Sequence, residues 1–179
     1  MKRSFLIFLA SIIFIASGCG YTTRSLLAPD LKTVYVSNFK NDINIPAEQS
    51  NTRMYRGYTP GMERDITKAV IDKFISDGNL NIAAESNADL IIKGNLTDFN
   101  REPLRYDAND NIEEYRIKLI VSLELKNCKT GKIMWTEKGF AGETTYRTSG
   151  SLAKSESAAI RDAITDLARR IVERTVEAW

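Results

Sequence analysis

Residues 114–126 read Glu114-Tyr-Arg-Ile-Lys-Leu-Ile-Val-Ser-Leu-Glu-Leu-Lys126. Every second position in this stretch is apolar, namely Tyr115, Ile117, Leu119, Val121, Leu123 and Leu125. The positions between them are polar or charged, with Ile120 as the exception. Because successive side chains of a strand point to opposite faces of a sheet, this alternation predicts an antiparallel strand with one buried face and one solvated face.

The neighbouring segments predict further strands of the same sheet. Residues 88–99 predict a strand, and the turn-forming cluster 107–111 joins it to the stretch above. After that stretch, Lys129-Thr-Gly131 predicts a turn into a hairpin partner that starts at Lys132–Glu137 and can continue toward Tyr146. Residues 31–39 predict a first strand, and residues 80–84 a short one.

Two helices complete the predicted fold. Thr59-Pro60 predicts the start of a helix, with Thr59 as N-cap, and Asp77-Gly78 predicts its end. A strand before this helix and a strand after it imply a parallel pair with a right-handed crossover. A second helix of roughly twenty residues is predicted from about Ser155. The sequence therefore predicts an α+β two-layer sandwich: a mixed, mostly antiparallel sheet of about four strands with two helices packed on one face.

The N-terminus has the pattern of a secretory signal. Lys2 and Arg3 precede an apolar run over 5–16, and Ser17-Gly18-Cys19 follows. The alternative is an uncleaved membrane anchor, which the short run and the small residues after it disfavour. The site resembles a bacterial lipobox, which implies cleavage of residues 1–18 and attachment of a diacylglycerol and an N-acyl chain, such as palmitate, to Cys19. Gly20 after the cysteine implies release to the outer membrane. We therefore expect a lipidated tether over 19–30 and a single domain over 31–179.

Composition excludes several classes of function. The 179-residue chain has no His and only two Cys, so it cannot form a Ser-His-Asp triad, a Cys-His dyad or a four-thiolate metal site. Phosphate-loop, dinucleotide-binding and nucleophile-elbow motifs are also missing from the sequence. Loss of residues 1–18 removes Lys2 and Arg3 and no acid, which leaves 23 basic and 23 acidic side chains and no indication of nucleic-acid binding.

The remaining candidates for chemistry are few. Glu113 and Glu114 are neighbours on a predicted strand, so their side chains point to opposite faces and favour surface ion pairs over catalysis. Cys128 lies in a predicted turn, where a lone thiol without a histidine is usually inert. We expect no enzymatic activity, no metal and no cofactor apart from the acyl groups on Cys19.

Five basic residues could instead bind an anionic partner. They are Arg101, Arg105, Arg116 and Lys118 around the central hairpin, and Lys154 ahead of the last helix. Guanidinium groups match phosphates in paired hydrogen bonds, and Lys154 could act together with the N-terminus of the helix. The alternative, which remains open here, is that these residues form an ordinary solvated charged face.

The chain resembles the LptE family of lipopolysaccharide-assembly lipoproteins. The resemblance rests on Gly18-Cys-Gly-Tyr21, Lys32-Thr-Val-Tyr-Val36, Pro60-Gly-Met-Glu63, and the run from 88 to 135 with Arg101-Glu-Pro-Leu-Arg-Tyr106, Glu114-Tyr-Arg116 and Thr130-Gly-Lys-Ile-Met-Trp135. It implies an α/β domain on the periplasmic side of the outer membrane, tethered to that membrane by Cys19. This domain would plug the LptD β-barrel, help it assemble and bind lipopolysaccharide during its insertion into the outer leaflet.

The resemblance also implies site residues. Leu152-Ala-Lys154 matches the family motif whose lysine contacts lipopolysaccharide, and Arg105 is the nearest candidate for the second basic contact. The stretch 41–59 is longer than the corresponding stretch usually is in the family, which implies either an extra contact with the barrel or a loop without a binding role. A different class of partner remains an alternative, in which the lipoprotein regulates a cell-wall (peptidoglycan) synthase by docking its polar sheet face onto that enzyme.

Overall fold

The computed structural model describes residues 27–43 and 58–177. The predicted signal peptide, Cys19, most of the tether and residues 44–57 lie outside the described residues. The described elements are β1 (Thr33–Val36), β2 (Lys40–Asn41), α3 (Met62–Asp77), β3 (Asn81–Ile82), the short 3-10 helix η1 (Glu85–Asn87), β4 (Leu90–Tyr106), β5 (Ile112–Asn127), β6 (Ile133–Arg147) and α4 (Glu156–Val176).

The sheet is mixed, as predicted, and has more strands than the sequence suggested. Its order is β3-β1-β4-β5-β6, with β2 also paired to β4, which makes six strands in place of about four. Strands β4, β5 and β6 are antiparallel, whereas β1 is parallel to β3 and β4, and β2 is parallel to β4. Strand β3 lies within the short strand predicted over 80–84 and is parallel to β1, as predicted. Strand β2 was not predicted, because its two residues carry no alternation that a sequence could reveal.

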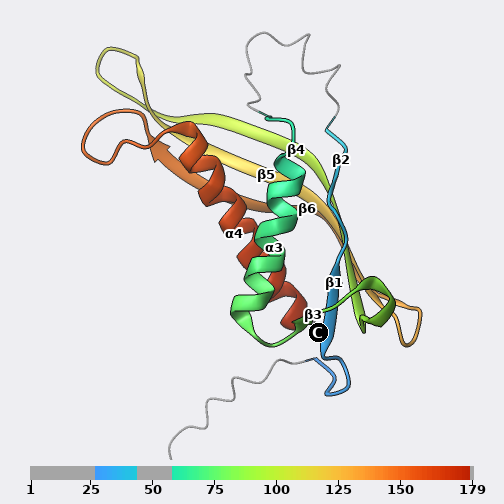
Figure 1. The fold of residues 1–179 in the computed structure, drawn as a ribbon. Coiled ribbons are helices and arrows are strands. Elements are labelled where there is room, and N and C mark those ends of the chain that lie inside the picture. Colours follow the sequence, from blue (N-terminus) through green and yellow to red (C-terminus); the bar gives the residue numbers. More distant parts are fainter. Residues whose placement is uncertain (1–26, 44–57, 178–179) are drawn as a thin grey trace, which may run out of the picture.

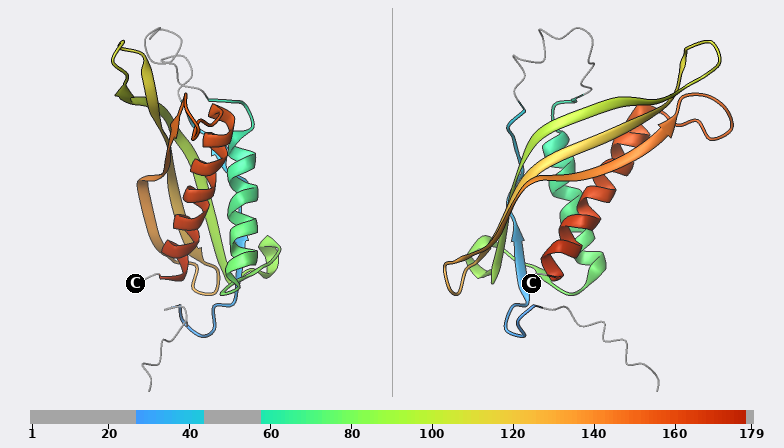
Figure 2. Two further views of the ribbon diagram at one scale, coloured as in Figure 1. Left: turned by 90° about the vertical axis from the view of Figure 1, so that its left-hand side faces the viewer. Right: turned by 180° about the vertical axis from the view of Figure 1, so that it is seen from behind.

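The hydrophobic core lies between the sheet and the two helices, which cover one face of it (Figures 1 and 2). In β5 the predicted alternation is confirmed, because Ile117, Leu119, Val121, Leu123 and Leu125 are buried and their neighbours are half-exposed. Helix α4 begins after Ser155, whose side-chain oxygen accepts a hydrogen bond from the Ala158 backbone N–H. The two-layer α+β architecture is therefore as predicted. The face turned away from α3 and α4 is called the outer face below.

Two predicted boundaries were wrong. Helix α3 begins at Met62, with Gly61 rather than Thr59 as its N-cap. Gly61 has φ 99°, a left-handed conformation that glycine adopts without strain, and its carbonyl accepts from the backbone N–H groups of Arg64 and Asp65. Strand β4 runs to Tyr106 instead of ending at Phe99. Pro103 is tolerated there because β4 is paired with β5 alone at that point and a register shift follows directly between Pro103 and Arg105; edge strands and bulges are where sheets accept proline.

The domain is elongated (Figures 1 and 2). Strands β4, β5 and β6 run past the helices, and the β4–β5 hairpin and the β6–α4 loop lie at one end, opposite the end where β1 starts. Residues 102–114 and 147–155 of these two segments are called the tip below. No helix in the described part of the chain is long and apolar enough to cross a membrane.

Candidate functional site

The two segments of the tip are bound to each other. Thr148 donates its backbone N–H to the Glu113 carbonyl (3.0 Å) and its hydroxyl to the Ile112 carbonyl (2.9 Å). The Lys154 backbone N–H donates to the Arg147 carbonyl (3.0 Å), which holds the β6–α4 loop closed. The tip is therefore one unit built from two distant parts of the sequence.

The tip combines basic and exposed apolar side chains. Arg105 and Lys154 are both more than half exposed; Arg105 lies 3.6 Å from Glu114, and Lys154 lies 2.8 Å from Asp162. Ion pairs this exposed contribute little and are easily exchanged for another anion. Three large apolar side chains are also exposed here, namely Leu104, Tyr106 and Leu152. This combination suits an amphipathic anion better than a purely ionic one.

Arg101 lies on the other side of the sheet from Arg116 and Lys118. It opposes buried Ile117 in β5, and its guanidinium donates to Glu156 at the start of α4 (2.9 Å) and lies 3.9 Å from the centre of the Tyr115 ring. Tyr115 in turn stacks on Tyr146, with the ring centroids 5.7 Å apart. The Arg101 side chain is only 19% exposed. Arg101 therefore closes the core beneath the tip.

Arg116 and Lys118 lie on the outer face. In the register of the sheet, Arg116 stands between Glu102 and Thr145, and Lys118 stands between Asn100 and Glu143. The outer face thus alternates basic and acidic side chains across its strands, which stabilises cross-strand pairs. Of the five predicted basic residues, only Arg105 and Lys154 lie in the two segments of the tip, and Arg105 stands opposite Glu114 on the same face of the sheet as Arg116.

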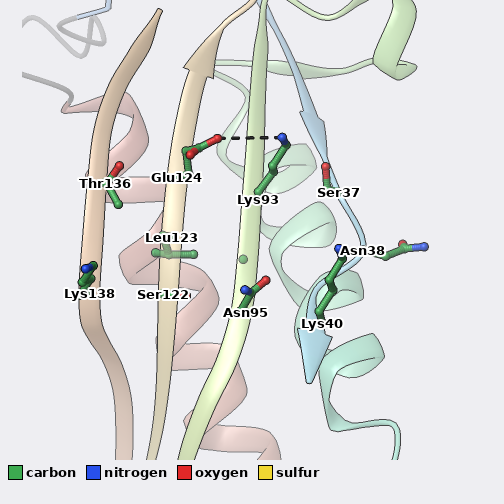
Figure 3. Close-up of a pocket in the computed structure, with 11 residues that line it drawn as sticks. Ser37, Asn38, Lys40, Lys93, Asn95, Ser122, Leu123, Glu124, Thr136 and Lys138 are labelled. Atoms are coloured by element: carbon green, nitrogen blue, oxygen red, sulfur yellow. Dashed lines mark ion pairs between the residues drawn. The ribbon is translucent and has the colours of Figure 1, made fainter. Parts of the chain in front are cut away.

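A polar groove on the outer face escaped the sequence analysis. It lies over β2, β4, β5 and β6 and is lined in part by Lys40, Lys93 and Lys138 (Figure 3). Lys93 was visible as a polar position in a predicted strand, but the sequence gives no signal that places Lys40 and Lys138 near it. The tip residues Leu104, Tyr106 and Leu152 were also missed as a set, although each lies within two positions of a basic residue that was singled out.

The described residues offer little for metal or thiol chemistry. No group of three or more Cys, Asp or Glu side chains in the ranges 27–43 and 58–177 is placed to hold a metal ion. Cys128 follows the end of β5 as a half-buried free thiol, and its backbone N–H donates to the Asp89 carbonyl (2.8 Å). Its structural surroundings are those of a turn residue.

Comparisons with known structures show the fold. The crystal structure of protein XCC0632 from Xanthomonas campestris is similar with a TM-score of 0.53 and 13% identity over 83% of this chain and 88% of that one. Hypothetical protein CT253 from Chlamydia trachomatis gives 0.50 and 9%, over 83% and 97%. The rare lipoprotein B from Shewanella oneidensis gives 0.47 and 14%, over 79% and 92%. No curated protein sequence matches the chain.

A family comparison is more specific. The sequence model of the LptE family, described as lipopolysaccharide-assembly, matches residues 31–175. The match covers every described strand and helix except the last residue of α4. The chain therefore belongs to the LptE family of lipopolysaccharide-assembly proteins.

Proposed function

We propose that this chain is a non-enzymatic lipoprotein of the outer membrane that plugs the LptD β-barrel, helps it assemble and binds lipopolysaccharide on its way to the outer leaflet. The observation that carries the proposal is the family match over residues 31–175, which starts shortly after the lipobox-like Gly18-Cys19. In this proposal residues 1–18 are removed, Cys19 is acylated, and residues 19–30 tether the domain to the periplasmic side of the membrane.

The shape of the domain supports a plug. The described chain enters the domain at one end, where β1 starts, and the tip lies at the other (Figure 1). Strand β4 alone has 17 residues, which at ~3.3 Å per residue spans roughly 50 Å. A domain tethered at its lower end can therefore place its tip deep inside a barrel while its anchor stays in the periplasmic leaflet.

The outer face supports the same role. A barrel lumen that conducts polar molecules is lined by polar side chains, so a protein that fills it needs a charged surface of mixed sign. Arg116 beside Glu102 and Lys118 beside Glu143 give the outer face this character. A lipoprotein that regulates a peptidoglycan synthase would also need a polar docking face, so the partner must be identified directly.

Co-purification tests the partner. The full-length chain, tagged at its C-terminus, is recovered from detergent-solubilised outer membranes, and LptD is expected with it in a constant ratio. A chimera that joins residues 1–30 to an unrelated domain is the control for anchoring alone and should recover no barrel. Recovery as a lone monomer while LptD is present would contradict the proposal. Crosslinks from the outer face to a peptidoglycan synthase would support the alternative.

The tip is the proposed lipopolysaccharide contact. Arg105 and Lys154 supply positive charge for phosphates, and Leu104, Tyr106 and Leu152 supply apolar surface for acyl chains. The tip variant Arg105→Glu/Lys154→Glu should bind lipopolysaccharide more weakly, and the difference should shrink as salt is raised. The control Lys32→Glu/Lys132→Glu makes the same charge change at exposed positions outside the tip. Equal affinity of both variants would remove the tip from the proposal.

A further inference from the structure

The groove on the outer face has a regular arrangement of polar side chains (Figure 3). In the register of the sheet, Lys40 of β2 lies beside Asn95 of β4, and Asn95 lies beside Ser122 of β5. Lys138 of β6 falls at the register shift opposite Ser122. One row across four strands therefore has a lysine at each end and two short polar side chains between them. The groove has a volume of about 530 Å3.

The groove is positively charged. Lys93 lies in the next row, and its ammonium is 4.0 Å from Glu124, the one carboxylate among the lining residues. The two end lysines, Lys40 and Lys138, are exposed and have no ion pair with any residue in the described ranges. The exposed Asp42 adds a second carboxylate beside the Lys40 end, where it accepts from the Asn95 side chain (2.6 Å). Three ammonium groups against two carboxylates still leave an excess of positive charge that attracts an anion.

The floor of the groove favours a sugar over a protein surface. Ser37, Ser122 and Thr136 contribute hydroxyl groups, and Asn95 contributes a side-chain amide whose nitrogen already donates to Asp42. Hydroxyl and amide groups both donate and accept hydrogen bonds. Protein interfaces instead centre on aromatic and other apolar anchors. Among the described residues, none of the exposed large apolar side chains lines the groove.

We propose that this groove holds the phosphorylated sugar head group of a glycolipid, with one phosphate at the Lys40 end and another at the Lys138 end. The two Cα atoms are three strand spacings apart, roughly 14 Å, and each lysine side chain can bend inward to meet a phosphate as a point charge. The acyl chains stay outside, because none of the exposed large apolar side chains in the described ranges lines the groove. This inference rests on the proposed function and adds to the tip a second, sugar-binding subsite.

Binding measurements on the full-length chain in detergent test the inference. The groove variant Lys40→Gln/Lys138→Gln is compared with Lys32→Gln/Lys132→Gln, which loses the same charge from exposed positions outside the groove. The probes are lipopolysaccharide, the same lipopolysaccharide after enzymatic dephosphorylation, and phosphatidylglycerol vesicles. The groove variant should bind intact lipopolysaccharide roughly tenfold more weakly than the parent, and the control should bind like the parent. Dephosphorylated lipopolysaccharide should bind the parent and the groove variant alike.

A second variant adds charge to the floor. Ser122→Asp places a carboxylate between the two lysines and should weaken binding of intact lipopolysaccharide while leaving the thermal midpoint near that of the parent, because Ser122 faces solvent.

Parent-like affinity of both groove variants overturns the inference; if the tip variant still loses affinity, the proposed function stands. An equal loss on phosphatidylglycerol vesicles overturns the sugar assignment. A parent that binds no lipopolysaccharide overturns both this inference and that part of the proposed function.

Discussion

Gly142 of β6 lies directly against Leu167 of α4. A Cβ atom at position 142 would stand 2.4 Å from the Leu167 Cβ and 2.6 Å from both its Cα and its backbone nitrogen. These distances are far below van der Waals contact, so no side chain fits between the strand and the helix at this point. Gly142 therefore sets how closely α4 packs on the sheet.

Gly142→Ala should lower the free energy of unfolding by about 2 kcal/mol, because the helix must shift to admit one methyl group. Urea denaturation measures the change. Leu167→Ala should not rescue the variant, since the collision is with the backbone of Leu167 as well as with its side chain. Thr145→Ala, an exposed position of the same strand, is the control and should stay within about 0.5 kcal/mol of the parent. Parent-like stability of Gly142→Ala would mean that the two layers are not packed at contact.

Gly94 of β4 faces a different obstacle, the buried ring of Phe39. A Cβ atom at position 94 would stand 2.1 Å from the ring. Because the obstacle is a side chain, Phe39→Leu should make room for it. Gly94→Ala alone should destabilise by about 2 kcal/mol, and the double variant should be more stable than the sum of the two single changes predicts. Strict additivity in a double-mutant cycle of urea denaturation would contradict this account.

Asp89 ties the start of β1 to the β5–β6 turn. One carboxylate oxygen accepts from the backbone N–H of Lys32 (2.9 Å) and from the backbone N–H (3.0 Å) and hydroxyl (2.9 Å) of Thr33. The other oxygen lies 3.1 Å from the Lys129 ammonium. The Lys32 N–H, the Lys129 ammonium and the Thr33 hydroxyl together hold the pKa of the Asp89 carboxyl well below its usual range.

This shift predicts an acid-dependent loss of stability. In the unfolded chain Asp89 binds a proton at the ordinary pKa of an aspartate, about 3.9, whereas in the folded chain it binds one only at lower pH. The contribution of the ionised Asp89 to the free energy of unfolding is therefore complete above about pH 3.9 and is lost as the pH falls below that value. Asp89→Asn should therefore give a flatter curve of unfolding free energy between about pH 5 and pH 2. Lys129→Met removes one of the four donors and should flatten the curve less. A parent and an Asp89→Asn variant with parallel curves would contradict the assignment.

Local periodicity made the main elements predictable. The alternation in β5 and the apolar stripe of α4, with Ser155 as its cap, are visible in the sequence because each depends on residues a few positions apart. The short strand β2 and the groove were not predictable, because they depend on which strands lie side by side. The pairing of Lys40 with Asn95 joins residues that the sequence separates by a helix.

A bulge explains why the five basic residues do not form one site. In β4 the residues facing the helices are Leu90, Ile92 and Leu96, and after the register shift between Leu96 and Asp98 they are Phe99 and Arg101. The extra residue reverses the alternation, because a strand has a period of two. Arg101 is thereby turned toward α4, whereas simple alternation from Leu96 would have placed it on the outer face. A sequence alone does not mark where such a bulge falls.

The ion pair between Arg101 and Glu156 should accordingly act on stability. Both side chains are less than one third exposed, and Arg101 also covers the Tyr115 ring. Arg101→Met should lower the free energy of unfolding by about 2 kcal/mol, because it leaves the Glu156 carboxylate partly buried without its closest cation. The double variant with Glu156→Gln should cost less than the two single changes together, as a double-mutant cycle would measure.

The matched control is Arg105→Met at the tip. The Arg105 side chain is 55% exposed and its guanidinium lies 3.6 Å from Glu114, so its loss should change stability by no more than about 0.5 kcal/mol. The two variants should then separate in binding: Arg105→Met weakens lipopolysaccharide binding at unchanged stability, whereas Arg101→Met, once corrected for the folded fraction, binds like the parent. A folded Arg101→Met protein with lost affinity would make Arg101 a direct contact of the ligand, because its effect could no longer be ascribed to the core it closes.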